Sequence, residues 1–288
     1  MSLDFTFGII TSCSEQHEQS WRDRMVYIFN SIRKQHIPNY EIIVVGGPKI
    51  TQGRFSYAMH KCIDIIHIPF DENQSPLNVG FDCESIHLDK RDYKDTHNKI
   101  MYKWGQDKNT GGIKPGWITR KKNVITQNAR YENIVFLHDY IALEDNWYSG
   151  FLKFGNDWDI CMTKIKDIFG KRFRDWVTWD HPQHGRRYLL DYNDSNYNYN
   201  YISGSYWVAK KYVMENEPLD ESFLALGVEV LANGRVKEKS ERVGEDLEWS
   251  LRVRKKYKYV MNTHSVVQHL KLKLTGDEKI IRPPLKTT

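Results

Sequence analysis

Apolar residues in the first third of the chain fall into short runs separated by an amphipathic segment. The runs at residues 5–11, 40–45 and 63–68 are rich in β-branched and aromatic side chains, which is typical of strands. Between the first two runs, residues 19–34 carry apolar side chains every three or four positions, which predicts a helix. A strand, a helix and a second strand in this order indicate parallel pairing through a right-handed crossover.

The same two patterns continue through the rest of the chain. Helical spacing is found at residues 116–129, 145–154 and 245–255, and strand-like runs lie at 133–137, 158–163, 204–209 and 258–261. Residues 70–114 are irregular and are expected to form a long loop region. Residues 191–201 alternate Tyr, Asn and Asp, so we expect a mobile polar–aromatic loop there.

Composition is that of a globular protein in a reducing compartment. The chain has 288 residues, of which 40% are hydrophobic and 27% charged, and this favours one α/β domain over residues 1–288. The four cysteines form no CxxC pair, so neither a zinc knuckle nor a disulfide framework is indicated. No run approaches the roughly 18 apolar residues of a membrane helix, and no signal peptide is visible. We therefore expect a cytoplasmic protein with at most peripheral membrane contact.

Polar residues follow several of the predicted strands, where ligands of open parallel sheets bind. Thr11 and Ser12 follow the first strand, Gly46 and Gly47 the second, and His138, Asp139 and Tyr140 the one at 133–137. The preceding helix carries a basic run with an amide, namely Arg120, Lys121, Lys122 and Asn123. Cations and amides of this kind suit a diphosphate, and the net charge of +5 is compatible with a phosphate-bearing substrate.

Two adjacent acids, Glu245 and Asp246, stand at the start of the helix predicted at 245–255. One carboxylate can act as general base toward an acceptor hydroxyl, and the other can hold substrate hydroxyls. Further along, His264 and His269 offer imidazoles that can ligate a metal. The alternative is that the acids only complement the helix dipole and the histidines are structural.

The order of these segments resembles the GT-A-fold glycosyltransferases, in particular the inverting family 2 and, more remotely, β-1,4-galactosyltransferases. The resemblance covers residues 5–269. It is carried by "NYEIIVVGG" as the second strand, "RKKNVITQNARYENIVFLHDY" as the basic helix and DxD strand, "VGEDLEWSLRVRKKY" as the Gly-Glu-Asp helix, and "VVQHLK" as the late metal-binding histidine. It implies a mixed, mostly parallel sheet with flanking helices, with a nucleotide-sugar half at residues 1–145, an acceptor and catalytic half at 146–271 and a peripheral tail at 272–288.

The resemblance also implies a role for each matching residue. Asp246 would be the catalytic base of an inverting single displacement, and Glu245 would orient hydroxyls. A donor nucleotide-sugar would bind near the residues already described at the strand ends and on the basic helix, which are Thr11, Ser12, Gly46, Lys122, Asn123, His138, Asp139 and Tyr140. The acceptor would be a glycan, a lipid-linked molecule or a protein, and nucleic acid is not an expected partner.

The chain departs from the family pattern at the DxD motif. His138 and Tyr140 occupy the two positions where acids are expected, with Asp139 between them. A Mn²⁺ or Mg²⁺ ion would therefore depend on His138, Asp139 and His269 as ligands. This departure leaves open whether the protein uses a metal at all.

A second polar cluster contains Asp175, Trp176 and Trp179, and the family places this stretch toward the acceptor. The tryptophans could stack on a sugar ring, or they could form a small aromatic core. The loop at 191–201 would, in the functional alternative, be a lid over the donor.

Three other classes of protein remain as alternatives. A sugar-1-phosphate nucleotidyltransferase would need a Gly-rich loop after the first strand, where this chain has Thr-Ser-Cys-Ser-Glu. A non-catalytic nucleotide- or sugar-binding module is disfavoured by the intact Gly244-Glu245-Asp246 run. Binding of single-stranded nucleic acid is disfavoured by the modest net charge.

Overall fold

A mixed β-sheet forms the centre of the molecule. The computed structural model describes residues 2–11, 18–47, 65–70, 118–185, 188–194, 197–221, 223–224, 228–230, 236–238, 245–273 and 278–280. In spatial order, the sheet consists of β3 (Ile65–Ile68), β2 (Tyr40–Val45), β1 (Phe5–Ile10), β4 (Asn133–His138), β9 (Tyr206–Lys210), β6 (Ile160–Lys166), β13 (Tyr259–His269) and β5 (Ile141–Leu143).

Most strands of this sheet point the same way. The pairs β2–β3, β1–β2, β1–β4 and β6–β13 are parallel. Strand β9 runs antiparallel to both of its neighbours, β4 and β6, and β5 runs antiparallel to β13. The expected mixed, mostly parallel fold is therefore confirmed, and its strands come from both the 1–145 and the 146–271 portions of the chain.

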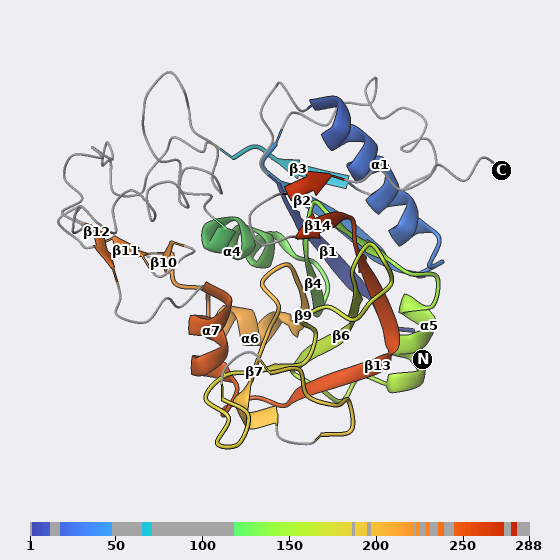
Figure 1. Ribbon diagram of the computed structural model, residues 1–288. Helices are drawn as coiled ribbons and strands as arrows, with labels where there is room; N and C mark the ends of the chain where they lie inside the picture. Colours follow the sequence, from blue (N-terminus) through green and yellow to red (C-terminus); the bar gives the residue numbers. More distant parts are fainter. Residues whose placement is uncertain are drawn as a thin grey trace.

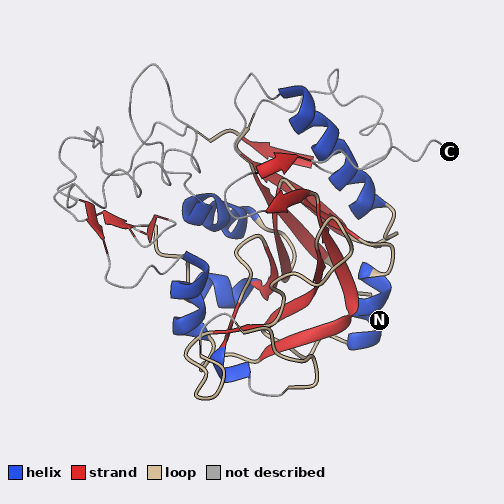
Figure 2. Cartoon of the chain, in the orientation of Figure 1, coloured by secondary structure: helices blue, strands red, loops and turns tan. Residues whose placement is uncertain are grey.

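Helices cover both faces of the sheet (Figure 1). They are α1 (Glu18–Arg33), α4 (Ile118–Asn128), α5 (Trp147–Phe154), α6 (Lys211–Asn216) and α7 (Glu245–Val253). Helices α1 and α5 lie on one side, and α4, α6 and α7 on the other; Figure 2 shows the same layers by type of secondary structure. Among the described residues, no helix combines the length and the apolar character needed to cross a bilayer.

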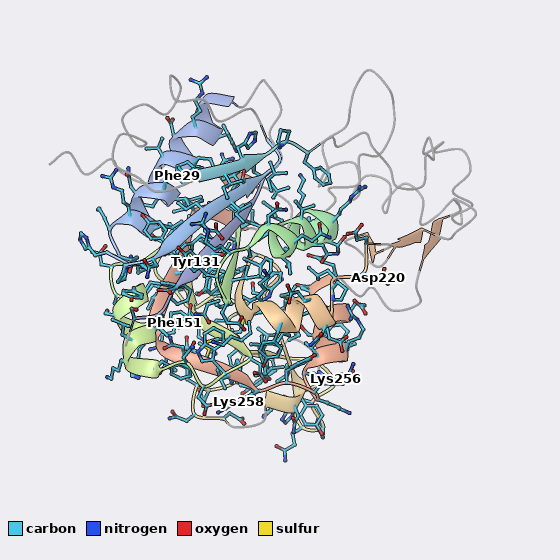
Figure 3. The ribbon with its side chains drawn as sticks, turned by 180° about the vertical axis from the view of Figure 1, so that it is seen from behind. Phe29, Tyr131, Phe151, Asp220, Lys256 and Lys258 are labelled. Atoms are coloured by element: carbon cyan, nitrogen blue, oxygen red, sulfur yellow. The ribbon has the colours of Figure 1, made fainter. Side chains whose placement is uncertain are left out.

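The core follows from the apolar runs of the sequence. Strands β1 and β2 are buried along their whole length, as expected for strands covered on both faces. Phe29 of α1 and Phe151 of α5, both labelled in Figure 3, pack into the core on one side of the sheet. On the other side, Ile125 of α4 lies so close to Gly8 that a Cβ there would come within 2.3 Å of it. This contact draws α4 tightly against β1, which brings its basic residues to the sheet.

Strand β13 is much longer than the run of residues 258–261 predicts. It pairs with β6 from Tyr259 to Gln268 and also with β5 from Val267 to His269, and its register with β6 shifts between Asn262 and Val266. Polar residues at this irregularity are buried and paired with each other, since Asn262 Nδ2 donates to Ser265 Oγ at 2.9 Å. These polar residues interrupt the apolar pattern of the sequence, but the strand continues through them.

The expectation of a mobile loop over residues 191–201 is wrong at its C-terminal end. There, η3 (Tyr197–Tyr199) leads into β8 (Asn200–Tyr201), which pairs with β7 (Val177–Thr178). Asn200 is fully buried, and the amide of Trp179 donates to the Tyr199 carbonyl at 2.6 Å. Strand β8 packs against α7, so this end of the segment is part of the folded structure.

Smaller sheets complete the described structure. One contains β10 (Phe223–Leu224), β11 (Val228–Val230) and β12 (Val236–Glu238), and another contains β14 (Lys271–Lys273) and β15 (Glu278–Ile280). The loop expected at 70–114 lies outside the described residues except for Phe70.

Candidate functional site

Thr11 and Asp139, which follow β1 and β4, meet at the carboxyl edge of the sheet. Thr11 Oγ1 donates to Asp139 Oδ2 at 2.9 Å, and Trp21 Nε1 donates to Thr11 Oγ1 at 2.7 Å. Arg24 of α1 pairs with the same carboxylate, with Nη2 at 3.3 Å from Oδ2, and its Nε donates to the Asp139 carbonyl at 3.2 Å. The side chains of Arg24 and Asp139 are about nine-tenths buried. Asp139 is therefore held in a neutralising ion pair.

Gly46 follows β2 and lies beside Thr11. Its φ of +87° is in the left-handed region, and a Cβ there would lie 2.5 Å from the Thr11 carbonyl oxygen. Lys121 of α4 donates from Nζ to that same carbonyl at 2.8 Å. Only glycine permits this close approach of the β2 end to Thr11 and Lys121. These contacts bring three predicted donor residues, Thr11, Gly46 and Asp139, to one edge together with a buried cation.

Lys122, the next residue of α4, points toward a different part of the edge. Its Nζ donates to the Gly204 carbonyl at 2.9 Å, lies 3.7 Å from Glu245 Oε1 and sits 4.2 Å from the centre of the Trp207 ring. Its side chain is 1% exposed. In this arrangement any effect of Lys122 on donor phosphates acts through its charge, because the ammonium itself contacts Gly204 and Glu245.

Asp246 lies at the start of α7 and is partly buried. Its Oδ2 accepts the Gly204 amide at 3.1 Å, and its Oδ1 accepts the Leu247 amide at 2.8 Å. Burial and the neighbouring charge of Glu245 raise the pKa of Asp246 to about 6, against the lowering effect of Lys122 and the two amides. A carboxylate with a pKa close to neutrality is well matched to general base chemistry.

The edge continues to His269 at the end of β13. Ser205 Oγ lies 3.4 Å from His269 Nε2, and the rings of Tyr140 and His269 are 5.0 Å apart. The Tyr140 hydroxyl lies 2.8 Å from His138 Nδ1. His138, Tyr140 and His269 thus belong to one polar and aromatic cluster between β4 and β13, whereas His264 lies at the irregularity in β13, where its amide donates to Asn262 Oδ1 at 2.9 Å.

The side chains predicted to ligate a metal do not form a metal site. Asp139, which would be the acidic ligand, has its Oδ2 engaged by both Thr11 and Arg24. Within the described parts of the chain, no three His, Cys, Asp or Glu side chains come together in a way that would hold a metal ion. Because Arg24 already neutralises Asp139, the described residues do not fit the expected Mn²⁺ or Mg²⁺.

Of the predicted donor residues that the structure describes, Asn123 is engaged away from the edge. Asn123 fastens the segment after α6, because its Nδ2 donates to the Leu219 carbonyl at 2.9 Å and its Oδ1 accepts the Leu219 amide at 3.0 Å. The neighbouring Asp220 is labelled in Figure 3. Ser12 lies outside the described residues. The donor roles of both residues stay predictions.

The predicted acceptor cluster is mostly internal. Asp175 is fully buried, and it accepts hydrogen bonds from the Ile165 amide, Arg172 Nε and the Tyr192 hydroxyl. Trp176 is 2% and Trp179 5% exposed. This burial leaves little ring surface for stacking on a sugar, so the arrangement favours the aromatic-core alternative.

Three residues of the edge escaped sequence reasoning. Arg24 lies within an amphipathic helix, where a charged residue normally indicates a solvated face. Gly204 and Trp207 lie at the start of an apolar strand, and the only sequence feature that marks them is the Ser203-Gly204-Ser205 run before it. Their partners are distant in sequence, so only the fold identifies them.

The architecture defines a class of mixed, mostly parallel α/β protein with a polar, charged carboxyl edge. No protein-family model and no curated protein matches the chain. Its structure is similar to solved structures of S. aureus TarS: a crystal structure with a TM-score of 0.47, a 1–349 form with 0.48, and that form in complex with UDP-GlcNAc with 0.46, each at 10% sequence identity. They cover 92% to 93% of this chain, which in turn spans 36%, 60% and 58% of theirs.

Proposed function

We propose that this chain is a glycosyltransferase that moves a sugar from a nucleotide-sugar donor to an acceptor hydroxyl by inverting single displacement. The observation that carries the proposal is the position of Asp246. It lies at the carboxyl edge of the sheet, where ligands of such sheets bind, and it has a pKa of about 6. An acid whose pKa is raised by burial and a neighbouring charge, at an edge where ligands bind, is a candidate functional residue.

In the proposed reaction Asp246 accepts the proton of the acceptor hydroxyl as that oxygen attacks the anomeric carbon. The new glycosidic C–O bond forms while the bond between the anomeric carbon and the diphosphate oxygen breaks. The electron pair of the broken bond leaves with the nucleoside diphosphate. Buried cations at the edge stabilise the negative charge that develops on this leaving group. Lys121 and Lys122 are two such cations.

The neighbourhood of Asp246 supports its use as a base. Both carboxylate oxygens accept one backbone amide each, which fixes the orientation of the group and leaves lone pairs for a proton. Glu245, which is paired with Lys122, is close enough to raise the pKa of Asp246. The acceptor's identity, whether glycan, lipid-linked molecule or protein, is left to experiment.

The test combines donor binding with turnover. Calorimetry with a panel of nucleotide-sugars, with and without Mn²⁺, should give heat for at least one donor. With that donor, Asp246→Asn should lower transfer by about a thousandfold or more while donor affinity changes less than threefold, because a base acts only in the chemical step. Glu248→Gln, on the same helix, serves as the matched control.

Two outcomes would contradict the proposal. Retained turnover in Asp246→Asn would remove the assignment of the base. The absence of heat with every nucleotide-sugar would favour a different class, and binding without any turnover would favour the non-catalytic module.

A further inference from the structure

Gly204 lies between the two charged groups of the α7 region. Its carbonyl accepts a hydrogen bond from Lys122 Nζ at 2.9 Å, and its amide donates to Asp246 Oδ2 at 3.1 Å. One residue thus connects the cation of α4 to the carboxylate of α7. A further hydrogen bond joins α7 to the segment before β9, since the Ser250 hydroxyl accepts the Ile202 amide at 3.0 Å.

The space around Gly204 requires the absence of a side chain. A Cβ built there would lie 2.9 Å from Asp246 Oδ2 and 3.2 Å from Asp246 Cβ and Cγ. Unlike Gly46, Gly204 does not have a φ in the left-handed region, so alanine is compatible with its backbone. A side chain at residue 204 would therefore displace the Asp246 carboxylate.

Lys122 is placed to hold the Gly204 peptide in this orientation. Its long side chain is 1% exposed, and the Trp207 ring lies 4.2 Å from its Nζ. This cation faces the acids Glu245 and Asp246 of α7, and its charge favours the ionised form of Asp246. Lys121, one position earlier, donates instead to the Thr11 carbonyl.

We propose that Gly204 and Lys122 are positioning residues, which hold the Asp246 carboxylate ionised and oriented for proton acceptance at the sheet edge. Lys122 fixes the Gly204 carbonyl, the Gly204 amide then fixes one carboxylate oxygen, and the missing side chain at residue 204 allows the approach. The use of this orientation in catalysis rests on the proposed function. The coupling between the three residues does not, so it can be measured separately.

The experiment compares Gly204→Ala and Lys122→Met with the matched control Lys121→Met. The first readout is a ¹³C NMR titration of the Asp246 carboxyl, which needs no substrate. Removal of the cation or displacement of the carboxylate from the Gly204 amide should move its midpoint to higher pH by about one unit. In Lys121→Met the midpoint should stay within about 0.3 units of the wild type, as expected for a lysine that serves the Thr11 side of the edge.

The second readout is the pH dependence of turnover with the donor found by calorimetry. Gly204→Ala should lower kcat by about a hundredfold with little change in the donor KM, and the acid limb of its profile should move to higher pH together with the NMR midpoint. If Lys122→Met does not fold, Gly204→Ala carries the test alone, because its methyl group meets a side chain at a partly exposed position.

The results distinguish the positioning role of Gly204 and Lys122 from the proposed glycosyltransferase function. An unchanged Asp246 midpoint in folded Gly204→Ala, or an equal shift in Lys121→Met, would overturn the positioning role. A shifted midpoint in a protein that turns over no nucleotide-sugar would uphold the coupling and reject the proposed function.

Discussion

Two parts of the same sheet edge differ in the balance between their acidic and basic side chains. Among the described side chains around Thr11, the acid Asp139 is accompanied by the guanidinium of Arg24, and the ammonium of Lys121 lies on the other side of Thr11. Around Gly204, two acids, Glu245 and Asp246, share the single ammonium of Lys122. The first part carries an excess of positive charge among these side chains, and the second an excess of negative charge.

This difference separates binding from proton transfer. An edge with surplus cations suits a diphosphate, and a pair of acids with one cation keeps one carboxyl ready to exchange a proton near neutral pH. Helix α4 serves both parts, because consecutive residues on a helix point about 100° apart. Lys121 and Lys122 are consequently adjacent in sequence but contact different strands.

The largest expected effect tests whether Asp139 depends on its cation. Arg24→Met should lower the free energy of unfolding by about 3 kcal/mol, because it leaves a buried carboxylate without its ion-pair partner. Chemical denaturation measures the change. Arg24→Met combined with Asp139→Asn should recover most of the loss. Lys258→Met, which removes an exposed pair with Asp157, should cost less than about 0.5 kcal/mol. If Arg24→Met cost no more than Lys258→Met, the ion pair would not be what stabilises Asp139.

A second, smaller effect tests the crowding around Gly46. Gly46→Ala should cost about 2 kcal/mol, since its φ is +87° and the new methyl group would meet the Thr11 carbonyl. Gly155 is a matched control with a φ of +90°, and a Cβ there meets no described atom within 4 Å. Thermal melting of the two variants should show the larger loss for Gly46→Ala. Equal losses would mean that backbone strain alone, without the contact to Thr11, accounts for the effect.

The smallest effect concerns the charge balance at α7. Glu245→Gln removes the neighbouring charge that raises the pKa of Asp246, so that pKa should fall and the acid limb of the turnover profile should move to lower pH by up to about one unit. The base is active above its pKa, so activity should extend into more acidic solution. Glu248→Gln, whose carboxylate pairs with Arg252 on the same helix, should leave the limb in place. A shift of the acid limb toward higher pH in Glu245→Gln would contradict the inference that the charge of Glu245 raises the pKa of Asp246.

The strands and helices with regular patterns could be predicted from the sequence. Strand β2 has the predicted bounds, and β1, β4 and α1 differ from the predicted ranges by a residue. In each case a continuous apolar run or a regular helical repeat corresponds to an element buried over its length or along one face. These elements also place Thr11, Gly46 and Asp139, so this part of the site could be located from sequence.

Elements whose polar residues are paired inside the fold could not be predicted. Asn262 and Ser265 interrupt the apolar pattern of β13, although their mutual hydrogen bond lets both be buried. Asn200 is also fully buried, although it lies in a polar segment whose pattern predicts a mobile loop. The ion pair of Arg24 with Asp139 spans 115 positions of the chain, and no local pattern encodes it.

The place of β9 in the sheet has a consequence for synthesis. This strand separates β4 from β6, although both of these precede it in the chain, so a nascent polypeptide that stops before Tyr206 leaves β4 as an open edge. The residues then uncovered include Val135, Phe136 and Leu137, an apolar segment of the kind that pairs with other chains. A ribosome stalled in this interval would therefore hold an aggregation-prone intermediate, and the completed strand β9 removes that hazard.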